Sequence, residues 1–392
     1  MFTSLTLVVL AGLLGPLLAA GRRPLTPVLV GELIAGAIIG RTWLHLIVST
    51  TQPLPEFSAV GFAMLMLEAG NEVDLRSTEL RVGAVRGNLA LLIALALSVP
   101  VGLGISALFQ AAHPSLLVVL LAGSSAAVAF PTIRERGLTG PAIAILITWM
   151  TVADALTAVL MPLTLSGASR IPLALVGDGV IVLVAAASMA AARRLFKTGL
   201  SDEVKRESKH RHWALQLRLS VLLLLALAAI AERTGASLLV AGFAAGIVLR
   251  RFNEPNRLAQ QLTGLASGFF VPAFFVLLGA SLDLSALVRS PSAIGLAVAM
   301  AIGATAVHVM ASLATGTQSR LSAGLLASAQ LGLPAAAASV GLASGALGPA
   351  VAAALVAGGV LTLVPASAGA LMLGRNPAGP TTEEVPGGPS AE

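Results

Sequence analysis

The sequence predicts an all-α polytopic membrane protein with about 13 transmembrane helices, arranged as two inverted six-helix repeats with a pair of broken crossing helices. Hydrophobic residues make up 56% of its 392 residues and charged residues only 11%, whereas about a quarter of a soluble domain is charged. The mean hydropathy is +0.92. The apolar residues come in runs of roughly twenty, the length at which a helix crosses about 30 Å of hydrocarbon. In that solvent only helices and closed barrels satisfy their own backbone hydrogen bonds, and the runs lack the strict alternation of barrel strands.

The apolar runs give the boundaries of the expected spans. They lie at about 2–20, 25–41, 56–71, 84–109, 114–135, 140–165, 171–195, 214–231, 235–250, 262–282, 291–315, 320–343 and 347–374. The first run is expected to be a retained span, because Arg22 and Arg23 follow it, whereas a signal peptide carries its basic residues in front. Residues 376–392 are rich in Pro, Gly and Glu and are expected to form a disordered cytoplasmic tail.

The basic residues predict the orientation of the chain. One set of alternate loops, with the tail, holds 20 of the 24 Lys and Arg residues; the opposite set holds only Arg41, Arg170, Arg233 and Arg289. Because positive charge collects on the cytoplasmic side, we expect the N-terminus outside and the C-terminus inside a bacterial inner (plasma) membrane. The same pattern argues against a nucleic-acid partner, as does the absence of Tyr for base stacking.

The predicted spans fall into two halves. The longest polar segment, 197–213, is basic and lies near the middle of the chain. We therefore expect one transmembrane domain over 1–375, with repeat one at about 1–166, a linker helix at about 167–213 and repeat two at about 214–375. Two six-span halves separated by one span have opposite orientations, the inverted topology of several secondary transporters.

Two spans, the fifth of each half, look interrupted. Gly123, Ser124 and Ser125 precede Pro131 in one, and Gln330 precedes Pro334 in the other. Proline removes a backbone donor, and the freed carbonyl groups then need other partners, such as a bound ion or water. An ordinary proline kink is the alternative for either helix. The pair indicates a transport site, with Ser124, Ser125 and Gln330 as ligands.

Asp154 lies near the centre of the sixth span. A carboxylate there costs on the order of 3 kcal/mol on insertion scales and usually marks a pathway or relay. Such a group takes either a proton or a cation, so competition for it is the simplest chemistry of exchange. Thr151 falls near the same helical face and could add an oxygen ligand. The alternative is a structural aspartate bonded to a neighbouring helix.

Three further titratable residues are candidates for proton or pH modulation. His308 is the only histidine inside a predicted span, and imidazole ordinarily titrates near neutral pH. Glu32 lies in the second span and Glu72 at the inner end of the third. For His308 the alternative is a packing residue, and Glu72 could simply lie in the interface.

The chain lacks the motifs of an enzyme. It contains no phosphate-binding Gly-rich loop with Lys-Ser/Thr, no HExxH and no serine nucleophile elbow. With no cysteine it can form neither a disulfide nor a thiolate metal site. We expect neither a cofactor nor a transition metal.

Several segments together resemble the bacterial monovalent cation:proton antiporters of the NapA and Kef-like branch. They are Val30–Gly36, Glu68–Asp74, Ala241–Gly246, Phe270–Gly279 and Gly324–Pro334, in the expected order over about 25–345. The resemblance implies a homodimer of thirteen-span protomers, each with a six-helix core domain that moves against a dimerisation domain. Asp154 corresponds to that family's ion-binding aspartate. Two positions depart from the pattern: Ala153 stands where the family usually has Asp, Asn or Gln, and His308 lies near the position of its core lysine.

We therefore expect a secondary transporter that exchanges Na⁺ or K⁺ for protons by alternating access, with Asp154 binding cation and proton competitively. One carboxylate instead of two favours one-for-one exchange. The alternatives are a sodium-coupled organic-solute transporter of related fold, and a non-transporting membrane sensor or scaffold. A Kef-type nucleotide-binding tail is expected to be absent.

Overall fold

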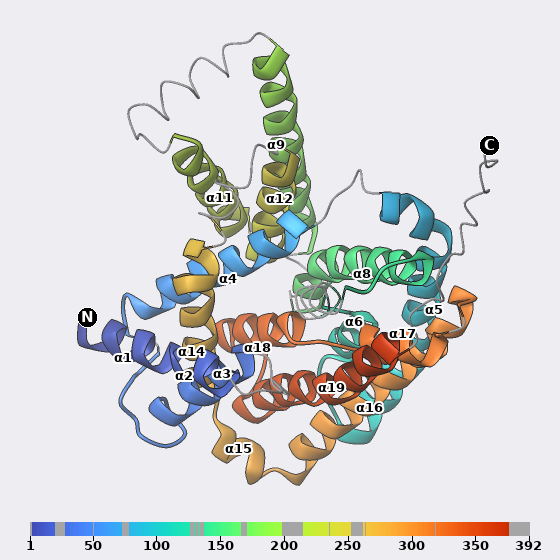
Figure 1. The fold of residues 1–392 in the computed structure, drawn as a ribbon. Helices are drawn as coiled ribbons and strands as arrows, with labels where there is room; N and C mark the ends of the chain where they lie inside the picture. The colour runs from blue at the N-terminus through green and yellow to red at the C-terminus, as the bar shows by residue number, and fades with distance from the viewer. Residues whose placement is uncertain are drawn as a thin grey trace, which may run out of the picture.

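The computed structural model describes residues 2–19, 28–49, 51–72, 78–125, 129, 133, 137–165, 171–197, 215–234, 236–251, 262, 264–317 and 319–375. Over these residues all regular structure is helical (Figure 1). The predicted all-α fold class is therefore confirmed. The predicted tail at 376–392 and nearly all of the polar segment 197–213 lie outside the described residues.

The helices follow one another as follows. The first half holds α1 (Phe2–Gly12), α2 (Leu14–Ala19), α3 (Val28–Ile39), α4 (Leu54–Glu72), α5 (Thr78–Phe109), α6 (Pro114–Ala122), α8 (Pro141–Leu165) and α9 (Ile171–Lys197). The second half holds α11 (Leu215–Thr234), α12 (Leu238–Arg251), the π-helix η1 (Ala266–Phe270), α14 (Val271–Ser281), α15 (Leu284–Val288), α16 (Pro291–Ser312), the 3₁₀-helix η2 (Leu313–Thr315), α17 (Arg320–Ala327), α18 (Gly332–Ser344) and α19 (Pro349–Arg375).

As far as the spans are described, each predicted span coincides with a helix or an interrupted helix. The span expected at 2–20 is divided into α1 and α2 by a turn at Leu13, and the one at 262–282 contains the π-helix η1 directly before α14. Among the described residues, six segments are long and apolar enough to cross a membrane: Gly83–Phe109, Pro141–Leu165, Ile171–Ala191, Pro291–Thr315, Arg320–Ser344 and Pro349–Leu373. Shorter apolar helices at Phe2–Leu17, Val28–Ile39, Leu238–Arg250 and Ala266–Ser281 accompany them.

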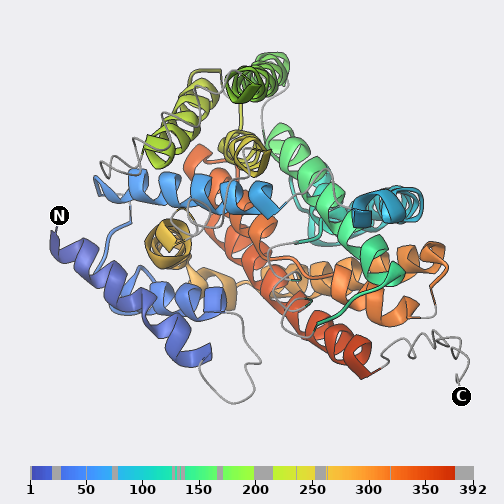
Figure 2. The same ribbon diagram turned by 45° about the horizontal axis from the view of Figure 1, so that its top comes forward.

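The helices form two groups. One comprises α1 to α4, α9, α11, α12 and α14; the other comprises α5, α6, α8 and α16 to α19. Figure 1 shows α1 to α3 on one side of the molecule and α5, α16 and α17 on the other, with α18 between them. Figure 2 shows the two groups from a second direction. Contacts of α8 with α12 and α9 join them.

Small residues let helices approach closely within the first group. A Cβ atom on Gly36 of α3 would clash with the carbonyl oxygen of Val276 on α14, and one on Gly279 would clash with that of Leu33. Close backbone approach of this kind is the usual mode of helix packing in lipid, where apolar burial alone contributes little.

The outer surface is apolar. Leu92 of α5, Leu183 of α9 and Leu222 of α11 are each more than 60% exposed. Such a surface is expected of a protein solvated by lipid and would promote aggregation in a soluble one. The interior holds Trp149, Phe274 and Phe275, which are fully buried.

Candidate functional site

The first predicted break is present. Helix α6 ends at Ala122, and the backbone then extends, with φ −69° and ψ 154° at Gly123. Residues 123–125 are not helical. Pro131, predicted to contribute to this break, lies outside the described residues.

The second break occurs between α17, which ends at Ala327, and α18, which begins at Gly332. Leu331 has φ −137° and ψ −48°, outside the helical region. Here Pro334 occupies the first turn of α18, where its missing N–H has no helical partner to lose. The proline therefore starts a half-helix rather than kinking a continuous one.

The two breaks contact each other. The amide of Ser125 donates to the carbonyl oxygen of Ala329 over 2.7 Å. A side chain from each break also donates a hydrogen bond to a carbonyl group at the end of the other half-helix. The hydroxyl of Ser124 donates to the carbonyl oxygen of Ala327 (2.7 Å), and Nε2 of Gln330 donates to that of Gly123 (2.6 Å). Carbonyl groups in the last helical turn lack partners within the helix, so these bonds satisfy groups that the breaks expose.

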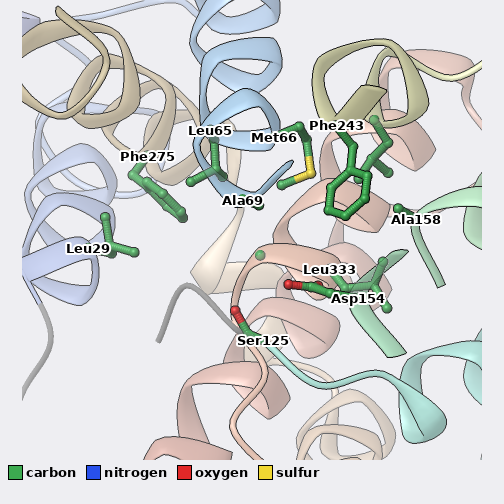
Figure 3. A pocket seen from close by; sticks show the side chains of 12 residues that line it. Leu29, Leu65, Met66, Ala69, Ser125, Asp154, Ala158, Phe243, Phe275 and Leu333 are labelled. Atoms are coloured by element: carbon green, nitrogen blue, oxygen red, sulfur yellow. The ribbon is translucent and has the colours of Figure 1, made fainter. Parts of the chain in front are cut away.

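Asp154 lies beside the place where the two breaks contact each other, which is called the crossing below. A cavity of about 20 Å³ is lined by Asp154 of α8, Ser125 of the first break and Gly332 at the start of α18. In Figure 3 the carboxylate and the Ser125 hydroxyl lie on the same side of this space. The cavity has room for about one water molecule or one ion without its hydration shell. The N-terminus of α18 carries a positive partial charge and favours negative charge on the carboxylate.

Apolar side chains close the cavity on the side of the first helix group. They are Leu29, Leu65, Met66, Ala69, Leu239, Phe243 and Phe275, with Ala158 and Leu333 beside Asp154. Figure 3 shows Met66 and Phe243 opposite Asp154. Because such walls exclude water, electrostatic interactions within the cavity are stronger than in solution.

A much larger cavity, about 1660 Å³, lies next along the same helices. It begins at Phe62 and Ala63 of α4, one turn before Met66, and at Pro162 of α8. It reaches the surface at Arg41 and Glu56, which are exposed. Its lining comes from the loops and helix ends predicted to face outside. The small cavity thus lies one turn from a cavity that opens at one end of the molecule.

Of the other predicted site residues, those whose side chains are described do not line the cavity. Thr151 is buried one turn before Asp154 but is not among the described lining residues. Ser124 and Gln330 hold the crossing through the bonds given above and do not line the cavity either. Glu72 is the last residue of α4, and its side chain is outside the described part of the structure.

His308 and Glu32 are both buried. The His308 ring stacks on Trp149, with ring centroids 5.4 Å apart, and its Nδ1 lies 2.8 Å from the carbonyl oxygen of Ala304. Its Nε2 and the indole Nε1 of Trp149 have no hydrogen-bond partner among the described residues. Glu32 is 1% exposed, and within the described part of the chain its Oε2 has no partner.

Most residues around the site were not predicted from the sequence, among them Met66, Phe243 and Thr362. Met66 and Phe243 close the cavity, and Thr362 of α19 bonds to the second break. Met66 and Phe243 are apolar residues within apolar spans, so their residue type does not distinguish them from their neighbours. Thr362 was detectable as a hydroxyl in the middle of an apolar helix, three residues after Gly359.

Comparisons with known proteins agree with this arrangement. A family model described as "Sodium/hydrogen exchanger, transmembrane" matches residues 7–372. The proposed Na⁺/H⁺ antiporter YjbQ of Bacillus subtilis is 28% identical over 305 residues, which cover 72% of this chain and 47% of that protein. The Na⁺/H⁺ antiporter NhaS5 of Synechocystis sp. is 28% identical over 291 residues, covering 71% and 39% respectively. The chain thus spans less than half the length of these two relatives.

A solved structure matches almost the whole fold. The sodium proton antiporter MjNhaP1 from Methanocaldococcus jannaschii aligns with a TM-score of 0.66 at 17% identity, covering 95% of this chain and 98% of that one. At this identity the likeness demonstrates a common fold.

Proposed function

Because this chain belongs to the sodium/hydrogen exchanger family, we propose that it exchanges Na⁺ for H⁺ across a membrane as a secondary transporter. Membership of a transporter family agrees with the expectation that the chain is not an enzyme. The names of the two relatives and of the solved structure support Na⁺ over K⁺ as the cation.

The observation that carries the proposal is the shared cavity of Asp154 and Ser125. Carboxylate and hydroxyl oxygens are hard ligands, the kind that alkali and alkaline-earth cations take in proteins. The space of about 20 Å³ suits a single ion that has shed its water. A proton on Asp154 removes the negative charge that would hold the cation. The two substrates therefore compete for one group, and each leaves as the other binds.

The same lining supports the proposed one-for-one stoichiometry. Asp154 is the only ionisable side chain among the described residues of the small cavity, and its neighbour Ala153 is a fully buried methyl group. A cycle that carries one Na⁺ one way and one H⁺ the other moves no net charge. We propose electroneutral exchange on this ground.

Alternating access is supported by the two cavities. The large cavity stops one turn short of the small cavity that contains Asp154, and apolar side chains of the first helix group close the small cavity. A displacement of the second group against the first would connect Asp154 to one side at a time. With the predicted orientation, the large cavity is on the outer side. We also propose that the protein forms a homodimer through the first helix group. Its two halves are proposed to be inverted repeats.

The small cavity disfavours the organic-solute alternative. Binding sites for small organic molecules usually have about 300 to 1,000 Å³. His308, Glu32 and Glu72 remain proposed modulators of proton binding. Since the His308 side chain lies outside the cavity, its influence on exchange would be indirect.

The test is Na⁺-driven dissipation of a pH gradient in proteoliposomes. We expect wild-type protein to respond to Na⁺ and Asp154→Asn to lose the response while eluting as folded protein in size-exclusion chromatography. Asp178→Asn is the matched control, because Asp178 is a buried aspartate on α9 that lines neither cavity.

Each outcome has a distinct meaning. No response of the wild-type protein to Na⁺ or K⁺ would remove the exchange proposal and favour a sensor or scaffold. Undiminished exchange by Asp154→Asn would remove Asp154 from the mechanism. A membrane potential set by K⁺ and valinomycin should leave the wild-type rate unchanged if the exchange is electroneutral.

A further inference from the structure

We propose that Thr362 is a positioning residue for the ion site: its hydroxyl, supplied by the last helix α19, holds the second break in the geometry that keeps Ser125 at the cavity. Thr362 itself is not among the described residues that line the cavity. It would therefore act through Gln330 and the crossing and would not ligate the ion. The functional part of this inference rests on the proposed Na⁺/H⁺ exchange.

The second break has an amide that bonds to a different helix and not to the break itself. The amides of Ser328 and Ala329 donate back to the carbonyl oxygens of Gly324 and Leu326, over 3.1 and 3.2 Å. The amide of Gln330 donates instead to Oγ1 of Thr362 over 3.0 Å. Within a membrane protein no bulk water can replace that acceptor. The Thr362 hydroxyl therefore supplies the acceptor for the Gln330 amide of the unwound backbone.

Thr362 is itself held in place. Its hydroxyl has two possible acceptors, the carbonyl oxygen of Gly359 at 2.6 Å and that of Gln330 at 3.3 Å. Donation to either leaves an oxygen lone pair for the Gln330 amide. Its side chain is 1% exposed. A Cβ atom on Gly359 would stand 2.9 Å from the carbonyl oxygen of Gln330 and 3.0 Å from Cγ of Pro334. A larger residue at 359 would push α19 away from the break.

The hydrogen bonds continue from Gln330 to the ion site. Nε2 of Gln330 bonds to the carbonyl oxygen of Gly123, and two residues later the Ser125 amide bonds to the carbonyl oxygen of Ala329. Gln330 is thus fixed on both sides, by Thr362 through its backbone and by Gly123 through its side chain. Ser125, which lines the cavity, is bonded to the residue directly before Gln330.

Loss of the Thr362 hydroxyl should loosen the break without unfolding the helices. The Gln330 amide would be left unpaired in a water-free interior, so the stretch 328–331 would shift or open to regain a partner. Ser125 would move with it. We expect the half-saturating Na⁺ concentration to rise about tenfold, the size of effect that one lost hydrogen bond can produce. The maximal rate should change less, because Asp154 still takes up and releases the proton.

The experiment compares Thr362→Val, Thr362→Ser and Thr305→Val with wild type. Valine keeps the shape of threonine and removes the hydroxyl, and serine restores the hydroxyl. Thr305 of α16 is the control, because its hydroxyl donates to Ala301 of its own helix over 2.8 Å. Amide deuterium uptake of the peptide containing 328–331 is measured in detergent, and the rate of Na⁺-driven exchange against Na⁺ concentration is measured in proteoliposomes.

We expect Thr362→Val alone to show faster uptake at 328–331 and a raised half-saturating Na⁺ concentration, with both values restored by Thr362→Ser. Unchanged uptake in Thr362→Val would overturn the inference, whether or not the protein transports. Raised uptake with an unchanged half-saturating concentration would overturn the link to the ion site. An inactive wild-type protein would instead count against the proposed function, and the uptake comparison would still decide whether Thr362 holds the break.

Discussion

The hydroxyl of Ser124 donates a hydrogen bond to the carbonyl oxygen of Ala327, 2.7 Å away across the crossing of the two broken helices. The hydroxyl of the next residue, Ser125, lies at the cavity that contains Asp154. The backbone is extended at Gly123, where the first break begins. Beyond it, the Ser124 side chain bonds to the second break and the Ser125 side chain lines the cavity.

The two serines should therefore respond differently to substitution by alanine. Ser124→Ala removes the donor to the Ala327 carbonyl group and should lower the free energy of unfolding by about 1–3 kcal/mol. The loss is measurable as a lower thermal midpoint in detergent. The half-saturating Na⁺ concentration should change less than twofold.

Ser125→Ala should affect Na⁺ binding and not stability. It removes an oxygen from the cavity and should raise the half-saturating Na⁺ concentration several-fold at an unchanged thermal midpoint, a change equivalent to about 1 kcal/mol of binding free energy. A lower thermal midpoint in Ser125→Ala together with a raised half-saturating Na⁺ concentration in Ser124→Ala would contradict the assigned orientation of the serines.

Competition for Asp154 predicts a specific dependence on pH. As the pH falls, a proton occupies the carboxylate more often, and Na⁺ must displace it. The half-saturating Na⁺ concentration should rise by about tenfold per pH unit at acid pH and become constant at alkaline pH, as mass action requires for one proton. Initial exchange rates at several pH values and Na⁺ concentrations measure this slope. A hundredfold rise per pH unit would indicate a second proton. A half-saturating Na⁺ concentration that does not change with pH would exclude competition at one site.

Met66 should restrict the size of the cation. Met66→Ala would add the volume of a thioether side chain to a cavity of about 20 Å³, so larger or partly hydrated cations would gain access. We expect the rate with K⁺ relative to that with Na⁺ to rise several-fold in the same proteoliposome assay.

The control for this variant is Met64→Ala. Met64 is also buried on α4 but lines neither cavity. Both truncations should destabilise the protein by roughly 2–5 kcal/mol, since both remove a buried side chain. Only Met66→Ala should change the ratio of K⁺ to Na⁺ exchange. An equal change in both variants would attribute the effect to destabilisation.

Much of the site could be predicted from residue type alone. Asp154 stands out because a carboxylate in mid-membrane is costly, and the two breaks stand out because small polar residues and proline interrupt otherwise apolar helices. Ser125 was predicted as a ligand and does line the cavity. Thr151, on the expected face of α8, does not, because near the crossing the lining depends on which helices approach and not on the face alone.

The sequence by itself determined that the chain is helical, because a backbone in hydrocarbon must satisfy its own hydrogen bonds and apolar runs of this length leave no other choice. It also determined where two helices break and which carboxylate lies in the middle of a span. Only the tertiary structure decided which groups meet: that Gln330 bonds to Gly123, that Thr362 bonds to Gln330, and that Met66 and Phe243 close the cavity over Asp154. These contacts join residues that are up to about two hundred positions apart. Local composition carries no information about such pairs, since they depend on how the two helix groups pack.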